Sequence, residues 1–189
     1  MNRIIVFALI LFCMTMQIEA QTLSEEEVTA KMYQAFELNK AGKKAEALEL
    51  FLIVGENTKQ QRNEGERQVY VCSQTMACQC YELLGRYQEG YLLGKCLLQG
   101  KLNDTERKDV SHLYAMNGYM YACEFIQRDE KGRADYKRGR ELISEILPYS
   151  DGQVKEYAET KIPLSWYFEG AQYAMTQSYD EALSSYEKA

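Results

Sequence analysis

The sequence contains few of the residues on which common active sites depend. It has one histidine and six scattered cysteines in 189 residues, which gives no converging set of zinc ligands and excludes most histidine-dependent chemistry. Two prolines exclude a proline-rich linker, and twelve glycines are too few for a collagen-like chain. No glycine-rich loop fits a phosphate cradle. We therefore expect no catalytic residue, no cofactor and no metal site.

A surplus of positive charge is also absent. The chain has 22 Lys+Arg against 28 Asp+Glu, which gives a net charge of −6. Nucleic-acid binding needs a basic stripe that displaces counterions from phosphates, so this class of partner is excluded. Hydrophobic residues make up 46% of the chain, which is enough for a packed core and argues against long disordered segments.

Only one long apolar run occurs, and it lies at the N-terminus. Residues 4–14 are apolar, follow Arg3, and lead through a short polar stretch to Ala20. This pattern is typical of a secretory signal peptide cleaved after Ala20. A membrane anchor is less favoured, because spanning a bilayer takes about 20 apolar residues. We expect residues 1–20 to be a signal peptide and residues 21–189 to be an exported domain in the periplasm or cell envelope.

The remaining sequence has the pattern of consecutive helices. Ser24 and Glu27 form a capping box at the start of a helix that we expect to end before Gly42. Alternation with period two is missing over any useful length, so strands are not expected. Further helices are predicted at about 44–54, 65–84, 87–98, 105–126, 133–147, 153–176 and 179–189, with Pro163 interrupting the seventh of the eight.

Small residues recur at fixed separations along these helices, which we group as four pairs with a first and a second helix each. Three of the four small-residue pairs are 12 residues apart, and the third pair is 21 residues apart. Such spacing indicates that the two helices of a pair approach closely at these points. The small residues of the first helices are Ala35, Cys78, Gly118 and Gly170, and those of the second helices are Ala47, Gly90, Gly139 and Ala182. Three positions after each first-helix small residue, a larger residue is expected to pack in the core: Leu38, Tyr81, Tyr121 and Tyr173.

The last pair shows a known pattern most fully. It has Trp166, Gly170 and Tyr173 in its first helix, then the run Tyr-Asp-Glu-Ala-Leu at 179–183, followed by Tyr186 and Ala189. This pattern resembles the tetratricopeptide repeat family, whose units are helix-turn-helix pairs. Residues 42–48 and 84–90 are similar to the family at the turn, whereas the third pair departs from it through nine extra residues at about 127–135.

The resemblance implies an all-α, right-handed α-solenoid of about four such pairs. The units would span about 24–60, 64–100, 104–148 and 152–189. Second-helix small residues are 43, 49 and 43 residues apart, longer than the family's repeat of 34. Elongated units of this kind look like the repeat regions of bacterial signalling proteins. Ala189 falls where the family's second helix has a turn still to run, so we expect a chain truncated at its C-terminus.

Cysteine and histidine chemistry is expected to be structural. Export permits disulfides, but five cysteines follow residue 20, so at least one thiol stays free. Cys78 occupies a small-residue packing place and is expected to be buried. His112 and Cys123 are eleven residues apart on one helix, about 16 Å, too far for a nucleophilic pair. The cysteines after residue 20 are Cys72, Cys78, Cys80, Cys96 and Cys123.

In this repeat geometry the first helices line a concave groove. That groove is aromatic and neutral to acidic, and it lacks the Asn and Lys/Arg set with which family members grip a terminal carboxylate. An apolar helix or extended polypeptide fits it better. Alternatively, its residues only cover neighbouring helices. Tyr119 and Tyr167 are expected to be neighbours and the main anchors. The candidate groove residues are Met32, Phe36, Gln79, Glu82, Tyr119 and Tyr167.

Three functions are consistent with these features. The first is an exported protein-interaction module that binds a polypeptide or ligand in its groove and has no catalytic activity. The second is the sensory input region of a two-component histidine kinase or other membrane signalling protein, with its output domain downstream. The third, less favoured, is an outer-membrane nutrient-uptake component. A membrane contact is expected only through the signal peptide or a downstream segment.

Overall fold

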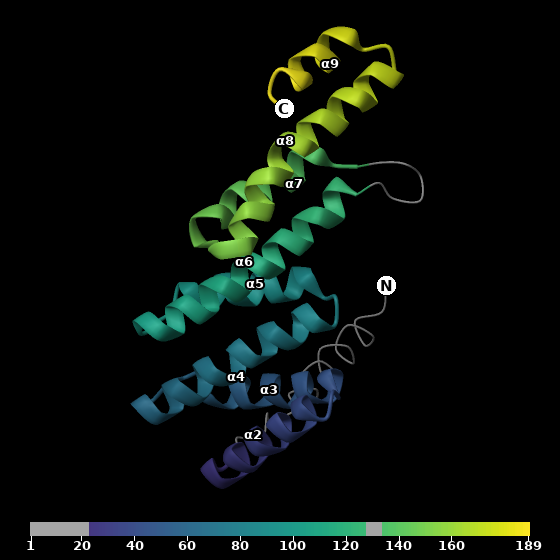
Figure 1. Cartoon of the computed structure of the whole chain (residues 1–189). Helices are drawn as coiled ribbons and strands as arrows, with labels where there is room; N and C mark the ends of the chain where they lie inside the picture. Colours follow the sequence, from purple (N-terminus) through teal and green to yellow (C-terminus); the bar gives the residue numbers. More distant parts are fainter. Residues whose placement is uncertain (1–22, 128–133) are drawn as a thin grey trace, which may run out of the picture.

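The protein is built from helices that follow one another in a stack. The computed structural model describes residues 23–127 and 134–189, and the expected signal peptide lies outside them. Figure 1 shows an elongated molecule with α2 at one end and α9 at the other. The expected all-α class is confirmed. The described ranges contain eight α-helices, α2 (Glu25–Lys40), α3 (Lys44–Thr58), α4 (Glu64–Leu83), α5 (Tyr87–Leu98), α6 (Asp104–Ile126), α7 (Tyr136–Ile146), α8 (Gly152–Met175) and α9 (Tyr179–Tyr186), with a 3-10 turn, η1 (Leu147–Tyr149), after α7.

Local sequence signals fix the helix ends. Ser24 and Glu27 form the expected capping box, in which Ser24 Oγ accepts a hydrogen bond from the Glu27 amide at 3.2 Å. Gly42 and Gly85 follow α2 and α4 with φ of +79° and +71°, a left-handed conformation that favours glycine. These turns let each second helix fold back along its first helix.

The structure corrects the expected interruption at Pro163 and describes only part of the expected insertion before α7. Pro163 does not interrupt a helix, because α8 runs without a break from Gly152 to Met175. A proline inside a helix removes one amide donor and crowds the carbonyl four residues earlier, but packing can hold such a helix together, and α8 packs against α7 and α9. The extra residues expected at about 127–135 lie partly outside the described residues, between the end of α6 and the start of α7.

Each helix packs on the next along the chain, and α4 also contacts α6, as α6 contacts α8. All eight small residues singled out above are buried. A Cβ atom on Gly139 would lie 3.1 Å from the Ala122 carbonyl oxygen, and one on Gly170 would lie 3.1 Å from the Ala182 carbonyl oxygen. Both distances are tighter than ordinary contacts, so glycine lets α6 approach α7 and α8 approach α9.

The same residues also serve contacts between successive pairs. A Cβ on Gly118 would lie 3.1 Å from the ring of Tyr91 in α5, and one on Gly94 would lie 3.1 Å from the Tyr114 Cα atom in α6. Asn117, which is fully buried, donates to the Cys78 carbonyl at 3.4 Å and so links α6 to α4. Small or polar residues at these points bring neighbouring pairs into register.

One side chain expected in the core lies at the surface. Tyr81 is buried, but Tyr173 at the equivalent place of the last pair is 37% exposed. It lines a groove between α7, α8 and α9 instead. In the inner pairs, the preceding pair contributes cover at this position, since Tyr81 shares an apolar cluster with residues of α2 and α3, and Tyr121 contacts Tyr91 of α5.

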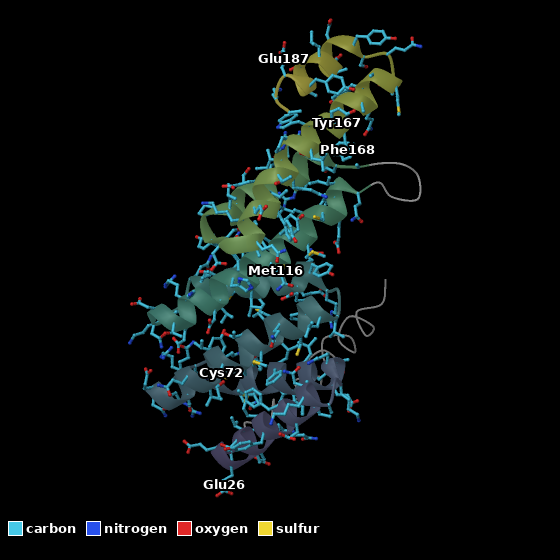
Figure 2. The ribbon with its side chains drawn as sticks, in the orientation of Figure 1. Glu26, Cys72, Met116, Tyr167, Phe168 and Glu187 are labelled. Carbon is cyan, nitrogen blue, oxygen red and sulfur yellow. The ribbon has the colours of Figure 1, made fainter. Side chains whose placement is uncertain are left out.

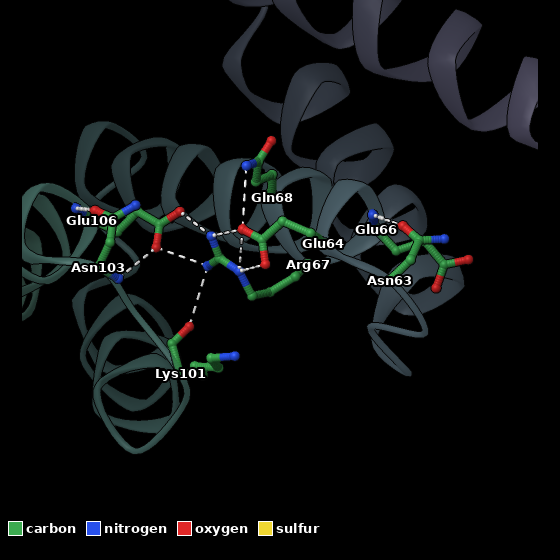
Figure 3. A network of polar contacts seen from close by, with 8 residues as sticks. All are labelled: Asn63, Glu64, Glu66, Arg67, Gln68, Lys101, Asn103 and Glu106. Carbon is green, nitrogen blue, oxygen red and sulfur yellow. Dashed lines mark hydrogen bonds and ion pairs between the residues drawn. The ribbon is translucent and has the colours of Figure 1, made fainter.

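A buried arginine joins α4 to α6 (Figure 3). Arg67 is only 7% exposed. Its guanidinium donates to the carboxylates of Glu64 and Glu106 and to the Lys101 carbonyl, at 2.7–3.2 Å. Glu106 also accepts from the Asn103 amide at 2.9 Å as part of a capping box. The network therefore fixes the starts of two first helices relative to each other.

The first prediction concerns the contact between α8 and α9. Gly170→Leu should lower the free energy of unfolding by about 2–4 kcal/mol, because a branched side chain must displace both the Tyr186 ring and the Ala182 carbonyl. Urea denaturation followed by circular dichroism measures the change. Ala171→Leu, at the adjacent and partly exposed position, is the control and should cost far less. Equal stability of the Gly170 variant and the native protein would refute this account of the contact.

A second prediction concerns acid stability. Hydrogen bonds from the Arg67 guanidinium hold the pKa of Glu106 below its ordinary value of 4.5, and they outweigh the opposite effect of burial, which raises this pKa. A carboxyl with a lowered folded-state pKa stabilises the protein fully above the unfolded value, and this contribution disappears as the pH falls through the folded value. Glu106→Gln should therefore flatten the fall in stability below about pH 4.5, measured as the melting temperature against pH. Glu46→Gln, on the exposed surface of α3, should leave the slope unchanged.

Candidate functional site

The first helices α2, α4, α6 and α8 share an exposed row of side chains. We define the first-helix face by the residues two and six positions before the small residue of each first helix. Tyr33 and Phe168 are 71% and 41% exposed, and Met76 and Met116 are half-buried. In Figure 2 the labelled Cys72, Met116 and Phe168 follow one another along the long axis. The face consists of Tyr33, Met76, Met116 and Phe168 in one row and Thr29, Cys72, His112 and Leu164 in the other.

A groove opens on this face between α4 and α6, next to the start of α8. Its volume is about 330 Å³. His112 lies within 3.2 Å of the Asp151 carboxylate, so the single histidine of the chain faces an acidic neighbour. Hydrogen-bond donors and acceptors thus alternate with apolar surface in one groove. The lining residues are Thr75, Met76, Gln79, Lys108, Asp109, His112, Leu113 and Asp151.

Two titratable side chains near this groove, Glu82 and Tyr119, have raised pKa values. Burial raises the pKa of Glu82, and the neighbouring His112 partly offsets this effect. Burial, together with the nearby Cys123 thiol, raises the pKa of Tyr119 to about 12. Tyr119 is therefore a protonated hydroxyl at neutral pH, able to donate a hydrogen bond. The groove presents no concentrated charge of either sign.

The candidate groove residues of the N-terminal half lie at the edge of the core. Met32 and Phe36 are half-buried and pack against the apolar cluster shared by α2, α3 and α4. The Phe36 ring meets Phe51 edge-on, with centroids 5.4 Å apart. Gln79 is exposed in the groove and Glu82 is half-buried. Met32 and Phe36 thus mainly cover neighbouring helices, whereas Gln79 is free to contact a ligand.

The expected pairing of Tyr119 with Tyr167 is wrong. Tyr119 is half-buried and stacks on Tyr157 of α8, with ring centroids 6.1 Å apart. Tyr167 instead contacts Phe168 and the Tyr186 ring of α9. The position in α6 that is equivalent to Tyr167 of α8 is Ala115, three residues before the small residue of its helix, and Ala115 is wholly buried. Positions assigned to the groove therefore partly serve the contact between successive first helices.

The first-helix face adjoins the positions that the sequence analysis assigned to the groove. Tyr33 is more exposed than the candidate Met32 before it, whereas the candidate Tyr167 and its neighbour Phe168 are both exposed, at 54% and 41%. The signal was present as a large apolar residue at the same place in all four helices. Periodicity alone could not show which of two adjacent positions the neighbouring first helix covers.

A second groove lies between α7, α8 and α9, with a volume of about 1000 Å³. Its centre is Trp166, with the Arg140 guanidinium 3.4 Å from the ring centroid and the Lys188 ammonium at 4.5 Å. Arg140 also donates to the Glu169 carboxylate at 2.8 Å. These cations are engaged by the indole and the carboxylate, so the groove is mainly a junction between helices.

The described part of the chain assembles no group of three or more His, Cys, Asp or Glu that could hold a metal ion. In the same ranges, all five cysteines have free thiols. None of the helices in residues 23–127 and 134–189 has both the length and the apolar character needed to cross a bilayer. What the first-helix face offers is therefore apolar contact surface with hydrogen-bonding groups beside it.

Thiol labelling tests the placement of this face. Burial raises the pKa of both Cys72 and Cys78, and that of Cys78 to about 12. Cys72 is exposed on the first-helix face, whereas Cys78 is only 1% exposed. Because the thiolate is the reactive form, a maleimide at pH 7.5 should modify Cys72 in the native protein and leave Cys78 unmodified. Peptide mass spectrometry measures both sites, with urea-denatured protein as the control. Modification of Cys78 as fast as Cys72 would contradict the orientation of α4.

Comparisons with protein-family models, with curated proteins and with solved structures find no match for this chain.

Proposed function

We propose that the protein is a tetratricopeptide-like, right-handed solenoid of four helix pairs that binds a polypeptide along its first-helix face. The architecture is supported by the sequential packing of the helices and by the recurrence of small residues at their contacts. Turn glycines in the left-handed conformation after α2 and α4 support it further. The units are the four pairs α2–α3, α4–α5, α6–α7 and α8–α9.

The row of Tyr33, Met76, Met116 and Phe168 is the observation on which the function rests. A large apolar side chain stands at the same place in four successive first helices. At the two ends of the row, Tyr33 is 71% and Phe168 41% exposed, whereas Met76 and Met116 between them are half-buried and pack partly against the core. Methionine adapts to irregular apolar surfaces, and rigid aromatics concentrate binding energy. The row therefore suits the apolar side chains of a bound segment.

The groove between α4 and α6 adds the polar contacts that a polypeptide needs. Gln79 provides donors and an acceptor for backbone amides and carbonyls. The Thr75 hydroxyl donates to the Val71 carbonyl and can only accept from a ligand, and His112 contacts Asp151 through Nδ1, which leaves Nε2 for a ligand. With little net charge in the groove, affinity should depend on apolar burial and change little with salt. The proposed partner is an apolar helix or extended segment, met in the periplasm or cell envelope. The protein acts by binding and not by catalysis, and a sensory role would use the same face.

Peptide selection tests this function. Peptides selected from a random phage-displayed library on the native protein should bind at least tenfold more weakly to Met116→Glu, because an ionised carboxylate would be placed against apolar side chains. Leu92→Glu, on the exposed surface of α5, is the matched control and should keep the native affinity. Fluorescence anisotropy with the selected peptides measures both, and circular dichroism checks folding.

The same peptides should protect Cys72 from maleimide, because that thiol lies in the second row of the face. Peptides that bind both variants with equal affinity and leave Cys72 reactive would show that the first-helix face is not the binding surface.

A further inference from the structure

The single histidine of the chain lies where the first-helix face meets the groove between α4 and α6. His112 belongs to the second row of that face and also lines the groove of about 330 Å³. Its side chain is exposed, and within the described residues only the ring nitrogen Nδ1 has a polar partner. A segment bound in the groove can therefore contact the other ring nitrogen, Nε2.

The partner of Nδ1 is a carboxylate that does not cap its own helix. Asp151 is the N-cap residue of α8, the position from which a side chain usually accepts a hydrogen bond from the first turn. Ser24, Asn63 and Asn103 accept such a bond in the other first helices, α2, α4 and α6. Asp151 makes none with the described first turn of α8, and its Oδ1 lies 3.2 Å from His112 Nδ1 instead. The carboxylate thus binds the histidine in place of capping its helix.

This contact selects one of the two neutral forms of the imidazole. An ionised carboxylate has only acceptor oxygens, so the ring nitrogen that contacts it carries the proton. With the proton on Nδ1, the neutral ring has a lone pair on Nε2. His112 is therefore a hydrogen-bond acceptor toward a ligand while it is neutral, and protonation turns the same nitrogen into a donor.

Charged side chains from three helices lie near the ring. Asp151 stands at the start of α8, and Glu82 of α4 interacts with His112 through its charge. Lys108 and Asp109 of α6 line the same groove one turn before the histidine. Histidine ordinarily changes its charge between pH 5 and 8, whereas Asp and Lys keep theirs in that range. Burial raises the pKa of Glu82, so the titration of this carboxyl must be separated from that of the imidazole.

We propose that His112 determines which hydrogen-bonding group the groove accepts, and that Asp151 is its positioning residue. At neutral pH, Nε2 accepts a hydrogen bond from a backbone amide or another donor of the bound segment. When the ring is protonated, that donor faces an N–H group and the contact is lost, so binding weakens as the pH falls. This role rests on the proposed binding of a polypeptide along the first-helix face, to which it adds polar specificity and control by pH.

The form of the ring can be measured directly, because the chain has one histidine. In ¹⁵N NMR spectra of untagged protein labelled at histidine, the native ring should be in the Nδ1–H form at about pH 8. Asp151→Asn replaces an acceptor-only carboxylate by an amide that also donates, so the Nε2–H form should increase. Asp109→Asn, in the same groove, is the matched control and should keep the native form. A predominance of Nε2–H in the native protein would overturn the proposal.

Peptides selected on the native protein at about pH 7.5 are the probe for binding. Peptides with blocked ends and without His, Asp or Glu are used, so that they do not titrate themselves. Their affinity, measured by fluorescence anisotropy, should fall by about fivefold or more between pH 7.5 and pH 5. His112→Gln cannot titrate, so it should bind with equal affinity at both pH values. Glu82→Gln should keep the native pH dependence, and circular dichroism at both pH values verifies that each variant is folded.

The binding results separate this inference from the proposed function. Equal pH dependence of the native protein and His112→Gln would overturn the inference, and so would loss of the pH dependence in Glu82→Gln. Peptides whose affinity is unaffected by Met116→Glu would instead contradict binding along the first-helix face, while the NMR spectra would still decide whether Asp151 orients the ring.

Discussion

The rest of the structure depends on the close approach of helices at a few small residues. At Gly139 a single added carbon would lie 2.5 Å from the Ile126 side chain and 3.1 Å from the Ala122 carbonyl oxygen. Protein interiors are close-packed and transmit such displacements to their neighbours. Because the helices follow one another along one axis, a shift at any contact moves everything beyond it. The alignment of Met76, Met116 and Phe168 therefore follows from packing behind the face and not from contacts within it.

Polar contacts fix the rotation of the helices where apolar packing alone would tolerate sliding. The partly exposed Glu145 of α7 accepts hydrogen bonds from the hydroxyls of Tyr91 and Tyr114, both at 2.9 Å, and from Lys95 at 2.6 Å. Burial and the bond to Glu145 raise the pKa of Tyr114, so its hydroxyl stays a donor. An ion pair as exposed as Lys95–Glu145 adds little net stability. The geometry of these contacts, however, accepts only one relative placement of α5, α6 and α7.

The sequence was sufficient to predict the helices, because capping residues, turn glycines and helical periodicity are local signals. It also located the small residues of the helix contacts, since each approach must be made by a residue of low volume. It failed at Tyr173, whose exposure depends on whether another helix lies beside it. It also failed at the expected contact between Tyr119 and Tyr167, because the alignment of adjacent first helices places Tyr157 beside Tyr119. The spacing of apolar residues within one helix does not show which of them a neighbouring helix will cover.

The junction between α7 and α8 differs in kind from the two before it. The first two junctions between pairs contain the apolar or aromatic side chains Leu48 and Tyr91. The third contains Arg140 of α7, which donates to Glu169 and Ser165 and stacks on Trp166. When this junction opens, the charged groups are hydrated again, and their hydration free energy offsets part of the free energy needed to break the contacts. The junction that joins α8–α9 to the rest of the stack thus depends on ionic and cation–π contacts, whereas the two junctions before it depend on apolar and aromatic packing.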